Sequence, residues 1–217
     1  MIDVLTDNFD RFAAGLWVTV RLVGISLIVA FVFGTLVAAL RVAPSRLLRS
    51  LGGVYVEVFR NIPLLVLLFI AFAGVRRAGL DISAWTAGTL SLGVYTSAYV
   101  GEALRSGVAA VSEGQMDAGL SLGFSYRDVL RRIVLPQAFR TVIPPLGSIT
   151  IAMIKNSAIV GASLLALPDL LKEARIVNSN TFQTTEAFFW AAVGYLLLTA
   201  TATVIFRALE ARYAIRR

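Results

Sequence analysis

Three stretches of the chain, residues 22–40, 82–101 and 187–206, contain no charged residue over nineteen or twenty positions. A helix needs about 20 mostly apolar residues to cross the hydrocarbon core of a bilayer, so each stretch could span one. The whole chain is also too apolar for a soluble domain, with 58% hydrophobic and 15% charged residues. These features predict an all-α membrane protein.

Two further apolar segments are shorter. Residues 62–75 are uncharged, and Pro63 near their start predicts a span that bends. Residues 141–154 contain two adjacent prolines and stop at Lys155-Asn156 before another apolar run, which predicts an interrupted span. The prediction is a single domain, 1–217, with five transmembrane helices at about residues 14–40, 54–75, 82–104, 137–158 and 187–207.

The basic residues predict the orientation of these spans. Residues 41–60, 102–140 and 207–217 contain thirteen of the twenty Lys and Arg residues. Because basic residues concentrate in cytoplasmic loops, these three segments are expected in the cytoplasm, with the N-terminus outside. The basic residues flank apolar runs and form no single patch, so nucleic acid is not an expected partner.

Several kinds of chemistry are excluded by composition. The chain has no His and no Cys, so thiolate or imidazole metal sites, disulfides and histidine acid–base pairs cannot form. It also lacks a Gly-x-Ser-x-Gly motif and a phosphate-binding loop of the Gly-x-x-x-x-Gly-Lys-Ser/Thr type. We therefore expect no catalytic residue, no metal site, no cofactor bound by this chain and no enzymatic activity.

One polar segment, MDAGLSLGFSYRDVLRRIVLPQ at residues 116–137, interrupts the apolar sequence. Ser112 with Gln115 is a capping-box pattern, and Gly123 is a good helix stop. A second start signal at Ser125 predicts another helix that continues to Pro136. Two short helices would then meet at Gly123 on the cytoplasmic side. A docking element and a well-capped connecting loop without a partner fit these signals equally well.

The spacing within this loop, about residues 108–136, resembles the EAA motif of permease subunits in ATP-binding-cassette importers. That motif reads Glu-Ala-Ala, three residues, Gly, nine residues, Ile, one residue, Leu-Pro. The matching positions here are Asp117, Ala118, Gly119, Gly123, Ile133, Leu135 and Pro136. Asp117 replaces Glu and keeps its charge, whereas Gly119 replaces the second Ala at a helix cost of about 1 kcal/mol.

Further motifs resemble the branch of this family that imports polar amino acids. They are FRNIPLLVLLF at residues 59–69, with Ile62 in place of the usual Thr, YTSAYVGEALRSGV before the loop, EGQ and LPQAFR within it, and KNSAIVGAS after it. The resemblance extends from about residue 15 to the C-terminus. It implies a type I ABC importer permease fold in the bacterial inner membrane, with the polar segment as a cytoplasmic coupling helix.

The resemblance also implies partners. They are two ABC ATPase subunits, which would hold ATP and Mg, a second permease subunit that is homologous or identical, and an extracytoplasmic amino-acid-binding protein. In such importers ATP binding closes the two ATPases and turns the bundle outward, and hydrolysis resets it. The motifs look closest to those of glutamate-type permeases, so glutamate or another polar amino acid is the expected substrate.

Polar residues at membrane depth are candidates for the substrate path, because irregular backbone and polar groups are tolerated there only beside protein or water. The candidates are Tyr95, Thr96, Ser97 and Tyr99 in the third span and Lys155, Asn156 and Ser157 in the fourth. In the alternative, the hydroxyls bond back to helix carbonyls, the tyrosines lie at interfaces and Lys155 ends the helix outside.

Two other functional classes remain in competition with the importer subunit. A secondary transporter or channel would move its substrate without an ATPase, although the chain shows no internal repeat. A membrane-embedded enzyme would need the His, Cys or paired carboxylates that the predicted spans lack. Outside the spans, residues 169–186 are long enough for one or two short surface helices, which could contact the binding protein or form a plain loop.

Overall fold

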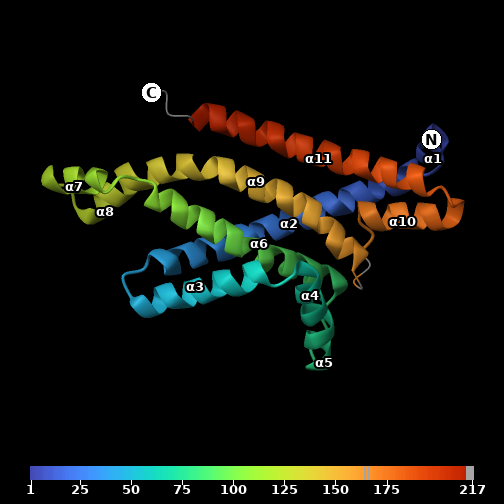
Figure 1. Cartoon of the computed structure of the whole chain (residues 1–217), viewed down its shortest axis with the longest axis horizontal. Helices are drawn as coiled ribbons and strands as arrows, with labels where there is room; N and C mark the ends of the chain where they lie inside the picture. Colours follow the sequence, from blue (N-terminus) through green and yellow to red (C-terminus); the bar gives the residue numbers. More distant parts are fainter. Residues whose placement is uncertain (164, 166, 214–217) are drawn as a thin grey trace.

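The computed structural model describes residues 1–163, 165 and 167–213, which form helices, turns and bends and no strand (Figure 1). The elements are α1 (Ile2–Asp7), α2 (Phe9–Val42), α3 (Arg46–Asn61), α4 (Leu64–Phe69), the π-helical turn η1 (Ile70–Gly74), α5 (Val75–Arg77), α6 (Ala84–Ala109), α7 (Glu113–Ser121), α8 (Tyr126–Val129), the π-helical turn η2 (Leu130–Val134), α9 (Leu135–Ala162), α10 (Leu170–Thr181) and α11 (Thr184–Tyr213). The prediction of an all-helical chain is confirmed.

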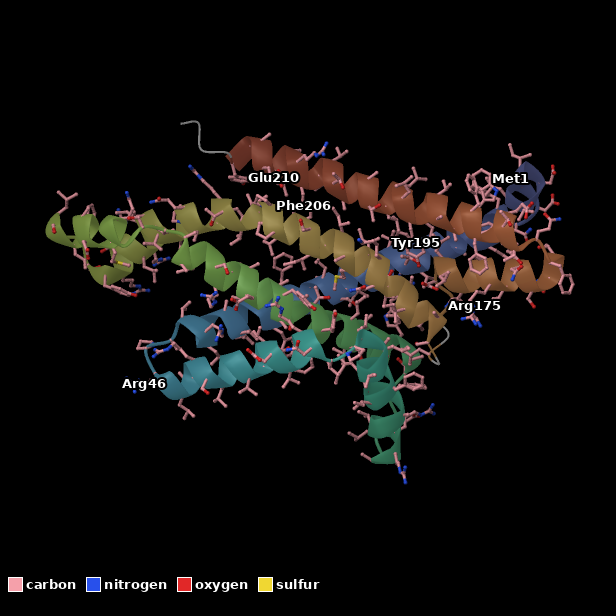
Figure 2. All side chains as sticks on the ribbon, viewed as in Figure 1. Met1, Arg46, Arg175, Tyr195, Phe206 and Glu210 are labelled. Carbon is pink, nitrogen blue, oxygen red and sulfur yellow. The ribbon has the colours of Figure 1, made fainter. Side chains whose placement is uncertain are left out.

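The long helices give the molecule two distinct ends. The turn between α2 and α3, the α7–α8 pair and the C-terminal end of α11 lie toward one end, whereas α1 and α10 lie at the other (Figure 1). Figure 2 likewise places Arg46 toward the first end and both Met1 and Arg175 at the second. The α2–α3 turn, the α7–α8 pair and the end of α11 at Tyr213, which belong to the three predicted cytoplasmic segments, therefore lie toward the same end of the molecule.

Helix α6 lies between α2 and α9 and packs along both. Twelve of its residues are buried, against three in the longer α11. Its neighbours approach closely, because a Cβ atom at Gly101 would lie 2.8 Å from Cγ1 of Val37 on α2. The hydroxyl of Ser26 also donates to the carbonyl of Thr89 across this interface, at 3.0 Å. Small residues that permit such contacts are typical of packed helices in membranes.

The low hydropathy of α6 agrees with its packing between other helices. Three helical segments are long and apolar enough to cross a membrane, namely α2, Tyr126–Ala162 and α11, and the bent pair of α3 with α4–α5 could be a fourth. Helix α6 is not among them, although 26 residues extend about 39 Å. Its Gly, Ser and Thr residues lower its hydropathy, and because α2 and α9 cover it, it does not need an apolar surface toward lipid.

The bend predicted at Pro63 is confirmed. Ile62 has extended backbone with ψ of 134°, as expected for a residue before proline, and α4 begins directly after Pro63. The helical segments before and after this break differ in direction by 101°. The second half, α4 to α5, therefore projects sideways from the bundle (Figure 1).

The predicted interruption of the fourth span is wrong. Helix α9 continues through Pro144, Pro145, Lys155 and Asn156 and ends only at Ala162. Each proline removes one backbone hydrogen bond, but the turns around them are buried, and the packed side chains hold the helical path. The prediction that a loop helix ends at Pro136 is also wrong. The π-helical turn η2 directly precedes α9, and Pro136 occupies its first turn, where the missing N–H is tolerated.

Candidate functional site

The α7–α8 pair forms a hairpin that projects from one end of the bundle (Figure 1). Gly123, with φ of +84°, ends α7 in a Schellman motif. The N–H of Phe124 donates to the carbonyl of Gly119 at 3.2 Å, and the N–H of Gly123 donates to that of Leu120 at 3.0 Å. Only glycine adopts this backbone conformation without strain, so the chain reverses here because of Gly123.

The caps predicted for the two hairpin helices differ in outcome. The Ser125 hydroxyl accepts from the N–H of Asp128 at 3.2 Å and donates to its carboxylate at 2.6 Å, so the predicted cap is present. At Ser112, α7 begins where predicted, but its side chain makes no cap hydrogen bond. That part of the capping-box prediction is wrong.

Gly119, the departure from the motif, has a structural reason. It is buried, and a Cβ atom there would lie 2.7 Å from Cγ2 of Val129 and 3.3 Å from Cδ1 of Ile133. Val129 is itself fully buried. Gly119 thus permits the close packing of α7 on the second half of the hairpin, which offsets its weak helix propensity.

The remaining motif residues divide by exposure. Asp117, Ala118, Gly123, Leu135 and Pro136 are exposed, whereas Ile133 is half-buried inside the hairpin. The sequence analysis missed an apolar tip around Gly123, consisting of Leu120, Leu122, Phe124 and Tyr126, with exposed fractions of 43%, 78%, 44% and 63%. The sequence does indicate this tip, because four large apolar residues surround the predicted turn at Gly123 within a polar segment. Such a surface on a projecting hairpin suits protein docking.

Three adjoining cavities lie along one face of α6, and Tyr99 lines all three. The first, of about 170 Å³, lies between α6 and α9 and is lined by Tyr95, Thr96, Tyr99, Ile149, Ala152, Met153 and Asn156. The second, of about 310 Å³, continues toward the hairpin end past Glu102, Ser106 and Thr141. The third, of about 290 Å³, opens toward α3 at Glu57, Arg60 and Asn61. Together they form a groove along this face of α6 that contains both apolar and polar side chains, and we call it the polar path.

Four of the seven predicted path residues line this path: Tyr95, Thr96, Tyr99 and Asn156. The hydroxyls of Tyr95 and Tyr99 are 3.2 Å apart. The other three residues lie elsewhere. Ser97 is buried against Tyr55, with their hydroxyls 2.7 Å apart; Ser157 is buried and donates to the carbonyl of Ile154 at 2.7 Å; and Lys155 is exposed.

Charged residues of the path were missed by the sequence analysis. The guanidinium carbon of Arg60 lies 5.2 Å from the ring centre of Tyr99, a cation–π contact. Glu102 accepts from Nε of Arg105 at 2.8 Å and lies 3.5 Å from a guanidinium nitrogen of Arg41. The path therefore presents both a cation and a carboxylate beside neutral hydroxyls.

At the opposite end, Asp169 is fully buried in the segment that joins α9 to α10. Its carboxylate accepts from the N–H of Lys172 at 2.9 Å, which caps α10, and from the hydroxyl of Tyr195 on α11 at 3.0 Å. Burial raises the pKa of Asp169 from 3.8 to about 6, although these hydrogen bonds oppose the rise. The N–H of Leu170 donates to Thr19 on α2, at 3.1 Å. The hydrogen bonds of Asp169 and Leu170 therefore hold the start of α10 against α2 and α11.

The residues of the path are suited to binding a small molecule. Within the part of the chain that the structure describes, no group of three or more Asp or Glu residues could hold a metal ion. The path offers hydroxyls, an amide, a guanidinium and carboxylates, which recognise a small polar molecule by hydrogen bonds and charge. A membrane bundle with a polar path and a projecting hairpin defines a transport subunit.

Comparison with known proteins gives the family. Residues 30–215 match the family model described as binding-protein-dependent transport system inner membrane component. The chain belongs to this family, and is therefore the inner membrane component of a binding-protein-dependent transport system in bacteria. The resemblance inferred from the EAA motif is confirmed.

Individual relatives are similar over nearly the whole chain. A probable glutamine ABC transporter permease protein, GlnM of Bacillus subtilis, is 40% identical over 97% of each chain. The glutamate transport system permease protein GluC of Corynebacterium efficiens is 39% identical over 84% of this chain and 85% of its own. A crystal structure of an amino acid ABC transporter with histidines contains a chain that is 32% identical, with a TM-score of 0.89 over 96% of both.

Proposed function

We propose that this chain is the permease subunit of an ATP-driven importer of polar amino acids, with glutamate or glutamine as the first candidates. The observation that carries the proposal is the pairing of the polar path along α6 with the projecting α7–α8 hairpin in one chain. The relatives named for glutamine and glutamate transport support this substrate class.

An amino acid matches the charges of the path. Its carboxylate would pair with the guanidinium of Arg60, and its ammonium group with the exposed carboxylate of Glu57. Tyr99 lies beside Arg60 and lines every cavity of the path, so it would contact the substrate throughout its passage. Ser97, Lys155 and Ser157 have no place in this proposal, because they do not line the path.

The hairpin would receive the ATPase. Its apolar tip, Leu120 to Tyr126, would bury itself in the partner, and the exposed carboxylate of Asp117 would lie at the rim. Glycine at 119 and 123 sets the shape of this surface. ATP and Mg would be held by two copies of that partner, and this chain would have no catalytic role.

The membrane arrangement follows from the two ends of the molecule. Five spans would be formed by α2, the bent α3–α5 segment, α6, α9 and α11, with the hairpin end in the cytoplasm and α10 outside. The gathering of the basic segments at the hairpin end supports this orientation. A second permease subunit would close the open side of the path, and an extracytoplasmic binding protein would deliver the substrate near α10.

The test is to tag the chain in its native cells, solubilise it mildly and identify stoichiometric companions by mass spectrometry. Uptake of radiolabelled glutamate, glutamine, histidine and alanine is then measured in the matching deletion strain. We expect a P-loop ATPase among the companions and loss of uptake of one polar amino acid. Recovery without an ATPase in several mild detergents would instead favour an autonomous transporter.

A further inference from the structure

The turn between α10 and α11 contains one residue whose backbone and side chain are both unfavourable for the fold. Phe182 has φ of +57°, the one positive φ of a non-glycine residue in the part of the chain that the structure describes. This backbone conformation favours glycine, and a bulky residue in it is strained. Phe182 is also 88% exposed, more than any other large apolar residue that the structure describes. The stability of this chain alone therefore does not account for a phenylalanine at this position.

Hydrogen bonds of the backbone and of neighbouring polar side chains hold this turn in place. The N–H of Phe182 donates to the carbonyl of Asn178 at 2.8 Å, which closes the last turn of α10. The hydroxyl of Thr184 donates to the side-chain oxygen of Asn178 at 2.8 Å. The N–H of Gln183 donates to the hydroxyl of Thr181 at 3.3 Å. These bonds fix the direction of the Phe182 side chain without using its ring, so the turn presents the ring to its surroundings.

The residues around Phe182 in the sequence are polar. Residues 178–186 read NSNTFQTTE, so Phe182 is the one apolar residue among eight polar ones. Of these, Asn180, Gln183 and Thr185 are exposed. An aromatic anchor within a rim of polar side chains is typical of protein–protein interfaces. A segment that enters a lipid surface instead presents several apolar residues together with Lys or Arg, and residues 178–186 contain neither.

The α10–α11 turn lies at the end of the molecule opposite the α7–α8 hairpin (Figure 1). The uncharged stretch of α11 begins only at Ala187. Trp190, of a residue type that favours the membrane surface, lies about 9 Å along the helix axis from Thr184, the first residue of α11. Phe182 precedes α11, so it lies beyond this level, on the side away from the membrane.

We propose that Phe182 is the anchor by which the extracytoplasmic binding protein docks on this chain, with its ring in an apolar pocket of that protein. The inference rests on the proposed function, which places the α10 end outside. The family description specifies dependence on a binding protein, which must reach the chain from that side. Because hydrogen bonds of Asp169 and Leu170 hold the start of α10 against α2 and α11, the partner would meet an ordered element, which lowers the entropic cost of docking.

The first test places the photoreactive analogue p-benzoyl-phenylalanine at position 182 of the tagged chain in its native cells. After illumination, we expect an adduct with an exported protein that, once purified, binds a polar amino acid. The matched control carries the same analogue at Phe189, which is 45% exposed in the apolar stretch of α11, and should give no such adduct. An adduct of position 182 with phospholipid alone, or equal yields of the protein adduct at both positions, overturns the proposal.

The second test measures the Kd of this binding protein for the intact complex in nanodiscs. Phe182→Gly should raise the Kd about tenfold, whereas Phe182→Tyr should stay within about twofold of the wild type. The melting temperature of Phe182→Gly should be no lower than that of the wild type, because glycine adopts φ of +57° without strain. An unchanged Kd, or a lower melting temperature that accounts for the loss, overturns the anchor role. Uptake and co-purified ATPase of the wild type show separately whether the proposed function stands.

Discussion

The two ends of the molecule each insert a short helical element between long helices, and they do so in opposite ways. At one end the α7–α8 hairpin projects from the bundle and exposes an apolar tip, with Leu122 78% exposed. At the other end α10 begins at Asp169, which is fully buried and hydrogen-bonded to Lys172 and Tyr195. Glycine is required at both ends, for a turn at Gly123 and for close packing at Gly161.

The difference teaches how burial separates two roles that look alike in sequence. The helix α8 of the hairpin and the helix α10 each begin with a capping side chain, Ser125 and Asp169, after a short non-helical segment. An exposed element with an apolar tip can bind and release a partner without loss of the fold. An element held by buried polar groups cannot move without breaking hydrogen bonds in a low-dielectric environment, which is costly. Changes at α10 should therefore affect stability, and changes at the hairpin should affect coupling.

The largest effect is expected at Gly161. A Cβ atom there would overlap the carboxylate of Asp169, so Gly161→Val must displace Asp169 and detach α10. Overpacking of this kind costs about 1–3 kcal/mol, in addition to the lost hydrogen bonds. We expect a large fall in the melting temperature of the detergent-purified protein.

Gly24 provides the matched control for this change. It lies on α2, and a Cβ atom at this position would have no atom within 4 Å outside its own helix backbone and chain neighbours. Gly24→Val should leave the melting temperature near that of the wild type. If the two variants have the same melting temperature, the close packing of Asp169 against Gly161 does not stabilise the protein.

The next effect concerns the hairpin. Gly123→Val places a β-branched residue at φ of +84°, which costs about 1–2 kcal/mol and distorts the turn. We expect uptake and the amount of co-purified ATPase to fall about tenfold, with a smaller fall in melting temperature than Gly161→Val causes. Gly123→Asn should retain most of the activity, because asparagine tolerates this conformation. Normal transport by Gly123→Val would contradict the docking role.

A pH dependence is expected at the α10 end. Because the pKa of Asp169 is raised from 3.8 to about 6, the folded protein holds this proton more tightly than the unfolded chain. Its contribution to stability therefore rises as pH falls through about 6, by about 1 kcal/mol between pH 7.5 and pH 5. Melting temperatures at these two pH values should differ less in Asp169→Asn than in the wild type. Equal pH dependence would show that Asp169 does not titrate in this range.

The smallest effect tests the packing inside the hairpin. Gly119→Ala gains helix propensity but brings a methyl group against Val129, and Val129→Ala relieves that contact. In a double-mutant cycle the pair should couple by about 1 kcal/mol, read as hydrogen-exchange protection of residues 113–134. If the two substitutions have additive effects on the free energy of hairpin opening, the close contact between Gly119 and Val129 does not contribute to stability.

Features that depend on a few neighbouring residues could be predicted from the sequence. The turn at Gly123, the start of α8 at Ser125 and the bend at Pro63 all follow from backbone preferences that act over a few residues. The family followed from the spacing of the EAA motif, which is equally local.

What the sequence could not predict depends on contacts between distant segments. Pro144 and Pro145 do not interrupt α9, because packing against neighbouring helices overrides their local cost. Asp169 looked like part of a polar surface loop, yet Tyr195 on α11 binds it inside the bundle. Arg60 joins the path only because α3 packs against α6 beside Tyr99.

The central claim is that the ATPase binds the tip of the α7–α8 hairpin, and the chain has no cysteine, which allows a direct test. Single cysteines replace Leu122 at the tip and Asn180 on α10, both exposed, and each carries a maleimide-benzophenone photocrosslinker. After illumination of membranes, we predict a cross-link to the ATPase from position 122 and none from position 180. A cross-link from 180, or none from 122 while transport persists, would contradict the claim.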